Sequence, residues 1–365
     1  MGAERRGDPL RPPLSIVWSQ PPTRRAILFA WLLRLTMRPL IALSTVISAW
    51  GLRFGPAGIE MWKLWARLHR LGDDLGRIGP PPGGTEIERI RLPQCAADYV
   101  WARDVPRGGR AILYFHGGGF VSGGLGTYRR FAARLSAATG ATVLNVGYRM
   151  LPRSPIHRAI GDGVDGYRRL LDDGHRAQDI VLAGDSAGGG LAFLVAHAIS
   201  DADLPRPAGV VGLSPWADLD PSDKLRHPAA RTDPVVPIQA AVFVVEKLVA
   251  RGEAVDPALS PVNLDLRRLP PALIHVGTTE VLALDAARLA DALAGAGVPV
   301  TLKFWQGQVH VFQVLGLDVL PEARQALDEI GAFVRRVTST PVPSAHAGQA
   351  VDAGEPPQRR RAQTG

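Results

Sequence analysis

Residues 181–200, VLAGDSAGGGLAFLVAHAIS, join a strand-like run to a helix-like run through a glycine-dense turn. The turn reads GDSAG from Gly184 to Gly188 and fits the pattern Gly-x-Ser-x-Gly. In this pattern a strand turns sharply into a helix, so that the serine is strained and its hydroxyl is exposed. A side chain at either glycine would collide with the neighbouring strand or helix. The turn predicts a nucleophile at Ser186, although glycine-rich turns of this kind also bind phosphates.

Strand-like and helix-like segments alternate on both sides of this turn. Between residues 80 and 338, short β-branched runs alternate with amphipathic runs of helix length. The alternation implies crossover connections, and therefore an α/β fold with a mostly parallel sheet and helices on both faces. The expected strands are 110–115, 141–148, 180–185, 209–214, 272–277 and 299–305. The expected helices are about 127–139, 156–173, 187–200, 283–296 and 321–337.

Composition favours one large domain with extensions. The chain has 365 residues, 46% of them hydrophobic, which suffices to bury a core of ordinary size. Residues 1–23 are rich in proline and arginine, and residues 339–365 have little apolar content, so both segments are expected to be disordered. The single cysteine, Cys95, excludes an intrachain disulfide and a cysteine-based metal cluster, and it is consistent with a reducing compartment. The cytoplasm is therefore the expected location.

The net charge is unevenly distributed. Most of the formal charge of +8 lies in residues 1–80, and the body from 81 to 338 is close to neutral. A nucleic-acid binder is expected to carry a basic stripe on its folded domain, together with a motif that reads a groove or stacks on bases. The sequence contains neither feature, so no nucleic-acid partner is expected. The oligomeric state stays open, with a homodimer as one possibility.

A second glycine cluster, HGGG at 116–119, directly follows the expected strand 110–115. Its bare backbone N–H groups can closely approach a ligand oxygen, which suits an oxyanion hole completed by the N–H group of Ala187. In open parallel sheets, ligands bind at the carboxyl ends of the strands. The segments HGGG, DSAGGG, TTE and GQVH all follow expected strands, so these four loops are expected to converge on one rim.

A serine nucleophile needs a base and an orienting carboxylate. In hydrolases of this shape both follow the serine, in the order acid and then histidine. Among the histidines after Ser186, His310 lies in the loop after the last expected strand, whereas His197, His227, His275 and His346 lie in a helix, an insertion, a strand and the tail. Elimination therefore favours His310 as the base.

Two carboxylates follow the expected strand 272–277. Glu280 lies three residues beyond the strand, and Asp285 lies five residues further on, where it is expected to be an ordinary acid at the start of a helix. Glu280 is the preferred partner of the histidine, with Asp285 as the alternative.

Four motifs together resemble the hormone-sensitive-lipase-like family of α/β-hydrolases, which includes bacterial carboxylesterases. They are HGGGF, GDSAGG, GTTEVLALDAARLADAL and GQVHVF, and the resemblance extends to YRMLPRSPIHRAIGDG and DPALSP, so that it covers roughly 85–337. Aspartate is the commoner acid in this family, and glutamate occurs in a subset whose loop reads much like GTTEVL. The resemblance implies an α/β-hydrolase fold with a catalytic triad of Ser186, Glu280 and His310 and an oxyanion hole formed by Gly118, Gly119 and Ala187.

The resemblance implies a serine carboxylesterase that hydrolyses short- to medium-chain acyl esters, or lactones, through an acyl-enzyme intermediate. Its partner is a small-molecule ester, and it requires neither a metal nor a cofactor. Two other classes stay open. An amidase or deacetylase acting on an acylated metabolite could use the same residues, and a non-catalytic receptor could use the same scaffold, as plant gibberellin receptors do. A receptor is expected to have lost a triad member, whereas all three are present here.

The resemblance also implies a helical cap over the serine, formed by residues 24–80 and the insertion 217–252, with 81–338 as the catalytic domain. Within the first segment, residues 24–50 read RRAILFAWLLRLTMRPLIALSTVISAW. Arg34, Arg38 and Pro39 interrupt the apolar run that a spanning helix needs, and no convincing cleavage site of a signal peptide follows it. At 100° per residue the arginines at 24, 34 and 38 lie within about 80° of one another, so most of the helix surface is apolar. Packing in the cap is preferred, with peripheral contact to a membrane as the alternative.

Overall fold

A computed structural model describes residues 14–53 and 80–338 of the protein. Within these ranges nine strands form one sheet, in the order β1-β9-β8-β7-β6-β4-β5-β3-β2. Strand β3 runs antiparallel to its neighbours β2 and β5, and every other neighbouring pair is parallel. The strands are β1 (Leu14–Trp18), β2 (Glu86–Arg91), β3 (Ala96–Trp101), β4 (Ala111–Phe115), β5 (Thr142–Gly147), β6 (Ile180–Asp185), β7 (Gly209–Leu213), β8 (Ala272–Gly277) and β9 (Val300–Trp305).

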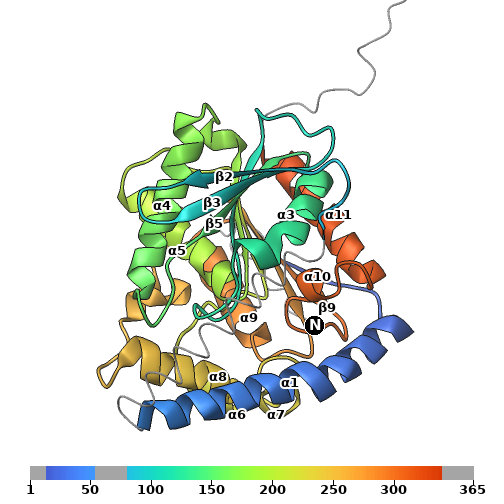
Figure 1. Ribbon diagram of the computed structural model, residues 1–365, viewed down its shortest axis with the longest axis vertical. Coiled ribbons are helices and arrows are strands. Elements are labelled where there is room, and N and C mark those ends of the chain that lie inside the picture. Colours follow the sequence, from blue (N-terminus) through green and yellow to red (C-terminus); the bar gives the residue numbers. More distant parts are fainter. Residues whose placement is uncertain (1–13, 54–79, 339–365) are drawn as a thin grey trace, which may run out of the picture.

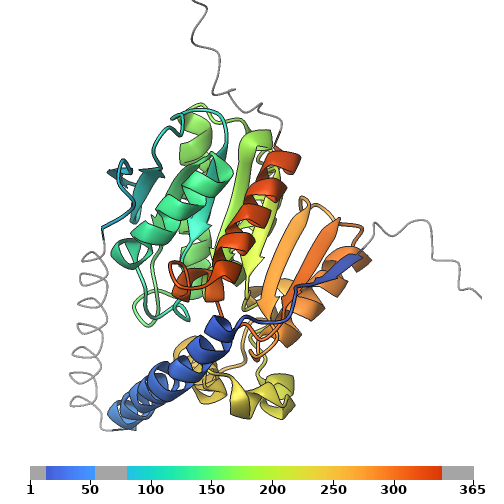
Figure 2. The same cartoon turned by 90° about the vertical axis from the view of Figure 1, so that its right-hand side faces the viewer.

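Helices cover both faces of this sheet (Figures 1 and 2). On one face, α3 (Leu125–Thr139) and α11 (Pro321–Val337) pack on the strands, and on the other face lie α4 (Ile156–Asp172), α5 (Ala187–Asp201) and α9 (Ala283–Gly295). The alternation of side chains along each strand explains the two layers. In β4, Ile112 and Tyr114 join the core beneath α3, whereas Leu113 and Phe115 join the core beneath α4 and α5.

The α/β fold expected from the sequence is confirmed, with a mostly parallel sheet between two helical layers. Each expected strand forms with ends within one residue of the expectation, and each expected helix within two. The antiparallel strands β2 and β3 and the edge strand β1 were not expected. β2 and β3 pair with each other along their whole length and extend the sheet beyond β5.

The expectation of a disordered arm over residues 1–23 is wrong for its described part. Residues Leu14–Trp18 form the edge strand β1, which pairs in parallel with β9. Trp18 stacks on Phe304 with ring centroids 4.7 Å apart, and the backbone N–H of Ser19 donates to the carbonyl of Phe304 at 2.9 Å. The apolar run LSIVW thus completes a sheet edge, which the surrounding prolines and arginines concealed in the composition. Residues 1–13 lie outside the described part.

Five helical segments lie at the end of the sheet where β4, β6 and β8 finish. In Figure 1, α1 runs along the lower edge of the molecule beneath α8. We call these segments the cap: α1 (Arg24–Arg53), α6 (Ser222–Arg226), α7 (Ala229–Thr232), α8 (Ile238–Phe243) and the π-helical segment η2 (Val244–Ala250). The expected cap segment 24–80 is described only to residue 53, and the expected disordered tail 339–365 lies outside the described residues. The division into a cap and a catalytic domain stays a prediction.

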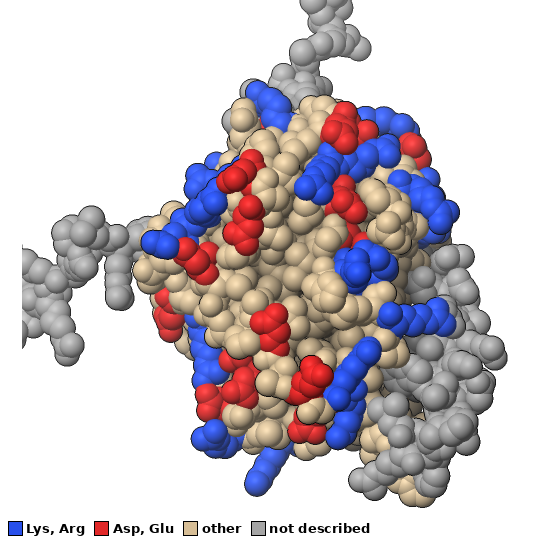
Figure 3. Space-filling view, turned by 90° about the vertical axis from the view of Figure 1, so that its left-hand side faces the viewer, with Lys and Arg blue, Asp and Glu red and all other residues tan. Residues whose placement is uncertain are grey.

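The surface of the body carries charges of both signs. On the face drawn in Figure 3, Lys and Arg side chains are interspersed with Asp and Glu side chains across an otherwise uncharged surface. This distribution differs from the single basic stripe that is typical of a nucleic-acid-binding domain.

Candidate active site

Ser186 lies at the sharp turn between β6 and α5. It is the N-cap of α5 and has a φ of 53° and a ψ of −122°, a left-handed conformation that non-glycine residues rarely adopt. A Cβ at Gly184 would lie 2.2 Å from the carbonyl oxygen of Gly188, and a Cβ at Gly188 would lie 2.1 Å from that of Phe115. Both positions therefore require glycine, which explains the two glycines that flank the serine.

The structure brings Ser186, His310 and Glu280 into one hydrogen-bonded chain. Nε2 of His310 lies 2.9 Å from Oγ of Ser186, and Nδ1 of His310 lies 2.6 Å from Oε2 of Glu280. An ionised carboxylate can only accept, so Nδ1 carries the proton and Nε2 is free to accept from the serine hydroxyl. The three side chains come from the loops after β6, β8 and β9, which meet at one rim as the sequence predicted.

Glu280 is held by two further donors. Its side chain is fully buried, and Oε1 accepts from the hydroxyl of Ser214 at 2.7 Å and from the backbone N–H of Gly277 at 2.7 Å. Ser214 follows β7 and also accepts from the backbone N–H of Val311 at 3.2 Å. It thereby joins the acid loop to the histidine loop. Sequence reasoning missed Ser214, and the available signal was its position at the carboxyl end of an expected strand.

Two opposing effects set the protonation of His310. Burial lowers the pKa of its imidazole, but the charge of Glu280 and the hydrogen bond to it more than offset this, with smaller contributions from Asp233 and Asp185. The net result is a pKa raised above the ordinary histidine value of 6.5. The site therefore stabilises the imidazolium form, which a general base must adopt during the reaction.

The HGGG segment follows β4 beside Ser186. Gly118 and Gly119 have φ values of 115° and 63°, and a Cβ at Gly118 would lie 2.1 Å from the carbonyl oxygen of Ser122. Both glycines line the pocket that also contains Ser186, and Ala187 is the first residue of α5. Within the described chain, the backbone N–H groups of these three residues have no protein acceptor. They are available to a ligand oxygen.

Asp185, the residue before the serine, holds the HGGG segment in place. It is fully buried and accepts from the hydroxyls of Tyr114 and Tyr128 at 2.6 and 2.8 Å and from the backbone N–H of Gly117 at 2.9 Å. Burial raises the pKa of Asp185 to about 6, against the opposing effect of these donors. Its role was not predicted from the sequence, where it is the variable position of the Gly-x-Ser-x-Gly pattern.

An apolar pocket of about 670 Å³ lies over Ser186 and His310. The cap supplies much of its wall, through Met37 and Ile41 of α1 and through Val244 and Leu248 of η2. The cap helices thus enclose the space next to the serine hydroxyl. Within residues 14–53 and 80–338, no group of three or more His, Cys, Asp or Glu side chains is placed to hold a metal ion.

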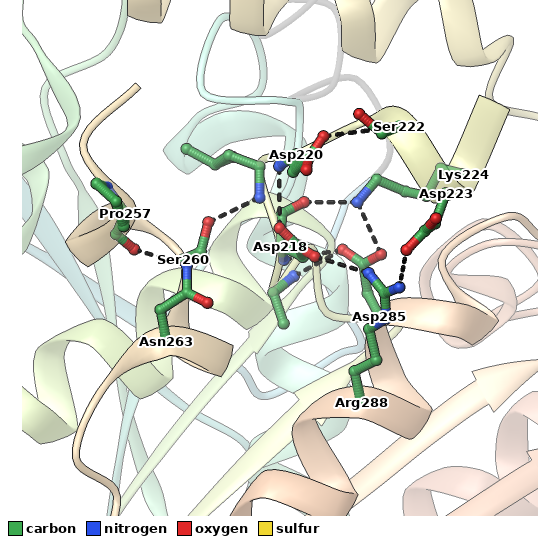
Figure 4. A network of polar contacts seen from close by, with 12 residues as sticks. Asp218, Asp220, Ser222, Asp223, Lys224, Pro257, Ser260, Asn263, Asp285 and Arg288 are labelled. Atoms are coloured by element: carbon green, nitrogen blue, oxygen red, sulfur yellow. Dashed lines mark hydrogen bonds and ion pairs between the residues drawn. The ribbon is translucent and has the colours of Figure 1, made fainter. Parts of the chain in front are cut away.

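Asp285, the alternative acid, lies in a separate polar network (Figure 4). Its Oδ1 accepts from Nζ of Lys224 at 2.9 Å, and its Oδ2 accepts from the backbone N–H groups of Ala217 and Asp218 at 3.1 and 2.9 Å. Lys224 and Asp285 are both fully buried. Asp285 lies in the first turn of α9, as expected, but the expectation that it is an ordinary acid there is wrong, because this carboxylate fixes the beginning of the insertion 217–252 to α9. Arg288 reinforces the same junction by contacting Asp218 and Asp223.

Comparisons with known proteins identify the family to which the chain belongs. A family model described as the alpha/beta hydrolase fold matches residues 112–314. An acetyl-hydrolase of Streptomyces hygroscopicus is 38% identical over 270 residues, which are 74% of this chain and 88% of the relative. The carboxylesterase/phospholipase LipF of Mycobacterium tuberculosis is 35% identical over 315 residues, which are 84% of this chain and 80% of the relative.

A solved structure is also similar. The crystal structure of an esterase from the bacterial hormone-sensitive lipase family superposes with a TM-score of 0.69 at 34% identity, covering 74% of this chain and 90% of that one. The fold, the family match and these relatives lead to one conclusion. The chain belongs to the α/β-hydrolase fold family, in the group that resembles hormone-sensitive lipase, and is a carboxylic ester hydrolase.

Proposed function

We propose that the protein is a serine carboxylesterase that cleaves short- to medium-chain acyl esters, or lactones, through an acyl-enzyme intermediate on Ser186. The observation that carries this proposal is the hydrogen-bonded chain from Glu280 through His310 to Ser186, whose serine end lies in an apolar pocket. The names of the relatives, an acetyl-hydrolase and a carboxylesterase/phospholipase, support acyl esters as the substrate class.

In the acylation step, Oγ of Ser186 attacks the ester carbonyl carbon while Nε2 of His310 takes its proton. The carbonyl oxygen becomes an oxyanion, which the N–H groups of Gly118, Gly119 and Ala187 stabilise, each lowering the barrier by about 3 kcal/mol. The imidazolium then gives its proton to the alkoxide leaving group, and the alcohol departs. Glu280 holds the imidazole in the required tautomer and stabilises its positive charge.

In the deacylation step, His310 accepts a proton from a water molecule that attacks the acyl carbon. The same backbone donors stabilise the second oxyanion, and the proton then passes from the imidazolium to Oγ of Ser186 as the acid leaves. Water thus supplies the hydroxyl of the acid product and the proton that restores the serine. The nucleophile, the base and the oxyanion donors of both steps are all groups of this protein.

The pH dependence of turnover tests the base. His310 must be neutral to accept the serine proton, and its pKa is raised, so kcat/KM should rise with pH through a single titration centred above 6.5 and then level off. The measurement is kcat/KM on a soluble acetate ester between about pH 5 and 9. Asp185→Asn is the control, because it removes the other nearby carboxyl whose pKa is about 6. A profile that is flat in both proteins, with chemistry limiting, would contradict a histidine base.

Substitutions at two positions of α1 test whether this helix forms part of the acyl-binding pocket. Ile41 of α1 lines the pocket, whereas Leu43 of the same helix is 57% exposed and does not. Ile41→Trp should fill the pocket and lower kcat/KM for octanoyl relative to acetyl esters by about tenfold or more, and Leu43→Trp should leave that ratio unchanged. The measurement is a ladder of soluble acyl esters. Equal chain-length profiles for the two variants would remove α1 from the acyl site.

The amidase and deacetylase alternatives use the same residues, and anilide analogues of the best ester distinguish them in the same assay. No described contact favours them over ester cleavage. A non-catalytic receptor is disfavoured by the intact chain of hydrogen bonds from Ser186 to Glu280.

A further inference from the structure

Helix α1 has two apolar sides, and only one of them is covered. Its inner side contacts the body, since Ala26 and Ser48 are 2% and 5% exposed and Ile41 lines the pocket. Six large apolar side chains on the outer side are between 45% and 58% exposed, namely Leu28, Trp31, Leu32, Leu35, Leu43 and Val46. At 100° per residue these six fall within about 120°, so they form one continuous stripe. We call them the outer stripe.

Exposed apolar side chains are concentrated in this part of the molecule. Among the described residues, every exposed large hydrophobic side chain except Leu225 and Val319 lies in β1 or α1. Single exposed apolar residues are normal, but a contiguous patch indicates a surface that contacts something else. In Figures 1 and 2 α1 runs along the outside of the described part of the molecule.

The charges on α1 indicate which occupant fits. The helix contains arginines at positions 24, 25, 34, 38 and 53 and no acidic residue. Of these, Arg24, Arg25 and Arg34 are exposed. Apolar side chains with tryptophan, flanked by several exposed cations, match the boundary between the acyl chains and the headgroups of an anionic bilayer. A symmetric pair of copies joined through this helix would instead bring two cationic helices together.

The contacts of α1 also decide its orientation. By length and composition alone, the segment Arg24–Trp50 could cross a membrane, since its mean hydropathy is 1.6. The expectation that its arginines make it too interrupted to span a membrane is therefore wrong by this criterion. In the folded protein, however, the guanidinium of Arg38 donates to the carbonyl oxygen of Asp233 at 2.9 Å, and the inner side lines the pocket. A helix bound along its length in this way offers only its outer side to lipid.

We propose that the outer stripe of α1 docks the protein on anionic membrane surfaces, with the helix parallel to the bilayer and the pocket directly behind it. Each apolar side chain of the stripe enters the interface, and the arginines contact the lipid phosphates. Where the proposed esterase activity holds, this position would let an ester dissolved in the membrane reach Ser186 past α1.

The test is co-sedimentation of the full chain with phosphatidylcholine vesicles that contain or lack about 30% phosphatidylglycerol. We expect binding to the anionic vesicles that weakens with salt. Leu35→Asp should lower the partition coefficient by about tenfold or more, whereas the matched control Val319→Asp, at a residue of similar exposure, should not. Arg34→Gln should weaken binding by about fivefold at low salt. Turnover of a soluble ester without vesicles should be unchanged in all three variants, which shows that they are folded.

Three results would overturn the docking surface. They are the absence of binding by the unaltered protein, equal losses in Leu35→Asp and Val319→Asp, and a dimer in sedimentation velocity that Leu35→Asp dissociates. The last result would show that the outer stripe contacts a second copy of the protein and not a membrane. Ser186→Ala should bind vesicles like the unaltered protein, so a failure of the proposed chemistry and a failure of docking are distinguishable.

Discussion

Ser186→Ala and His310→Ala should each lower ester turnover by ~10⁴-fold or more, and the double variant should be hardly slower than either single one. The reason is that Oγ of Ser186 and Nε2 of His310, 2.9 Å apart, act in one proton transfer. Without either partner the other has no function, so the two losses do not add. The measurement is kcat/KM on soluble esters with each purified variant.

The control for this prediction is a measurement of thermal stability, which shows whether the variant is still folded. Ser186→Ala should not lower the thermal unfolding midpoint by more than a few degrees, since Ser186 is partly exposed and its turn is fixed by backbone contacts. Substantial turnover in pure Ser186→Ala protein would remove Ser186 from the mechanism. Losses that multiply in the double variant would show that the two residues act independently.

Glu280→Gln should lower turnover by about 10³- to 10⁴-fold, because the amide no longer fixes the tautomer of His310 or stabilises its positive charge. Since Glu280 raises the pKa of His310, the residual activity should also titrate at a lower pH than in the unaltered protein. This shift in the pH profile separates an effect on the histidine from a general disturbance of the structure.

Asp285→Asn is the matched comparison, and its expected effect is on stability. It leaves the ammonium group of Lys224 buried without its carboxylate, which typically costs about 3–5 kcal/mol of unfolding free energy. Turnover per folded molecule should change far less than in Glu280→Gln. Chemical denaturation and kcat on the two variants check both parts. The reverse ranking, with Asp285→Asn the slower and Glu280→Gln the less stable, would transfer the role of the acid to Asp285.

The elements that the sequence predicted are those whose causes are local in the chain. Gly184 and Gly188 mark the turn because only glycine fits beside the neighbouring backbone, and that requirement is visible in five consecutive residues. His310 and Glu280 could be located because parallel strands deliver their following loops to one rim. The spacing of apolar residues sufficed for the central strands and their covering helices.

The features that the sequence did not predict depend on partners far away in the chain. Strand β1 exists because β9, almost 300 residues later, offers it an edge, and a short apolar run among prolines gives little sign of this. The support of Glu280 by Ser214 and the pairing of Asp285 with Lys224 join residues more than 60 positions apart. A single serine, lysine or aspartate has no periodicity that would reveal such a contact.

Labelling with a fluorophosphonate, followed by mass spectrometry of the peptides, tests the central claim most directly. A fluorophosphonate reacts with a serine only where a base activates the hydroxyl and an oxyanion hole stabilises the developing charge. We predict one adduct per chain, located on Ser186, that appears in step with the loss of esterase activity and is absent from Ser186→Ala. An adduct on another residue, or full esterase activity after complete labelling of Ser186, would contradict the account.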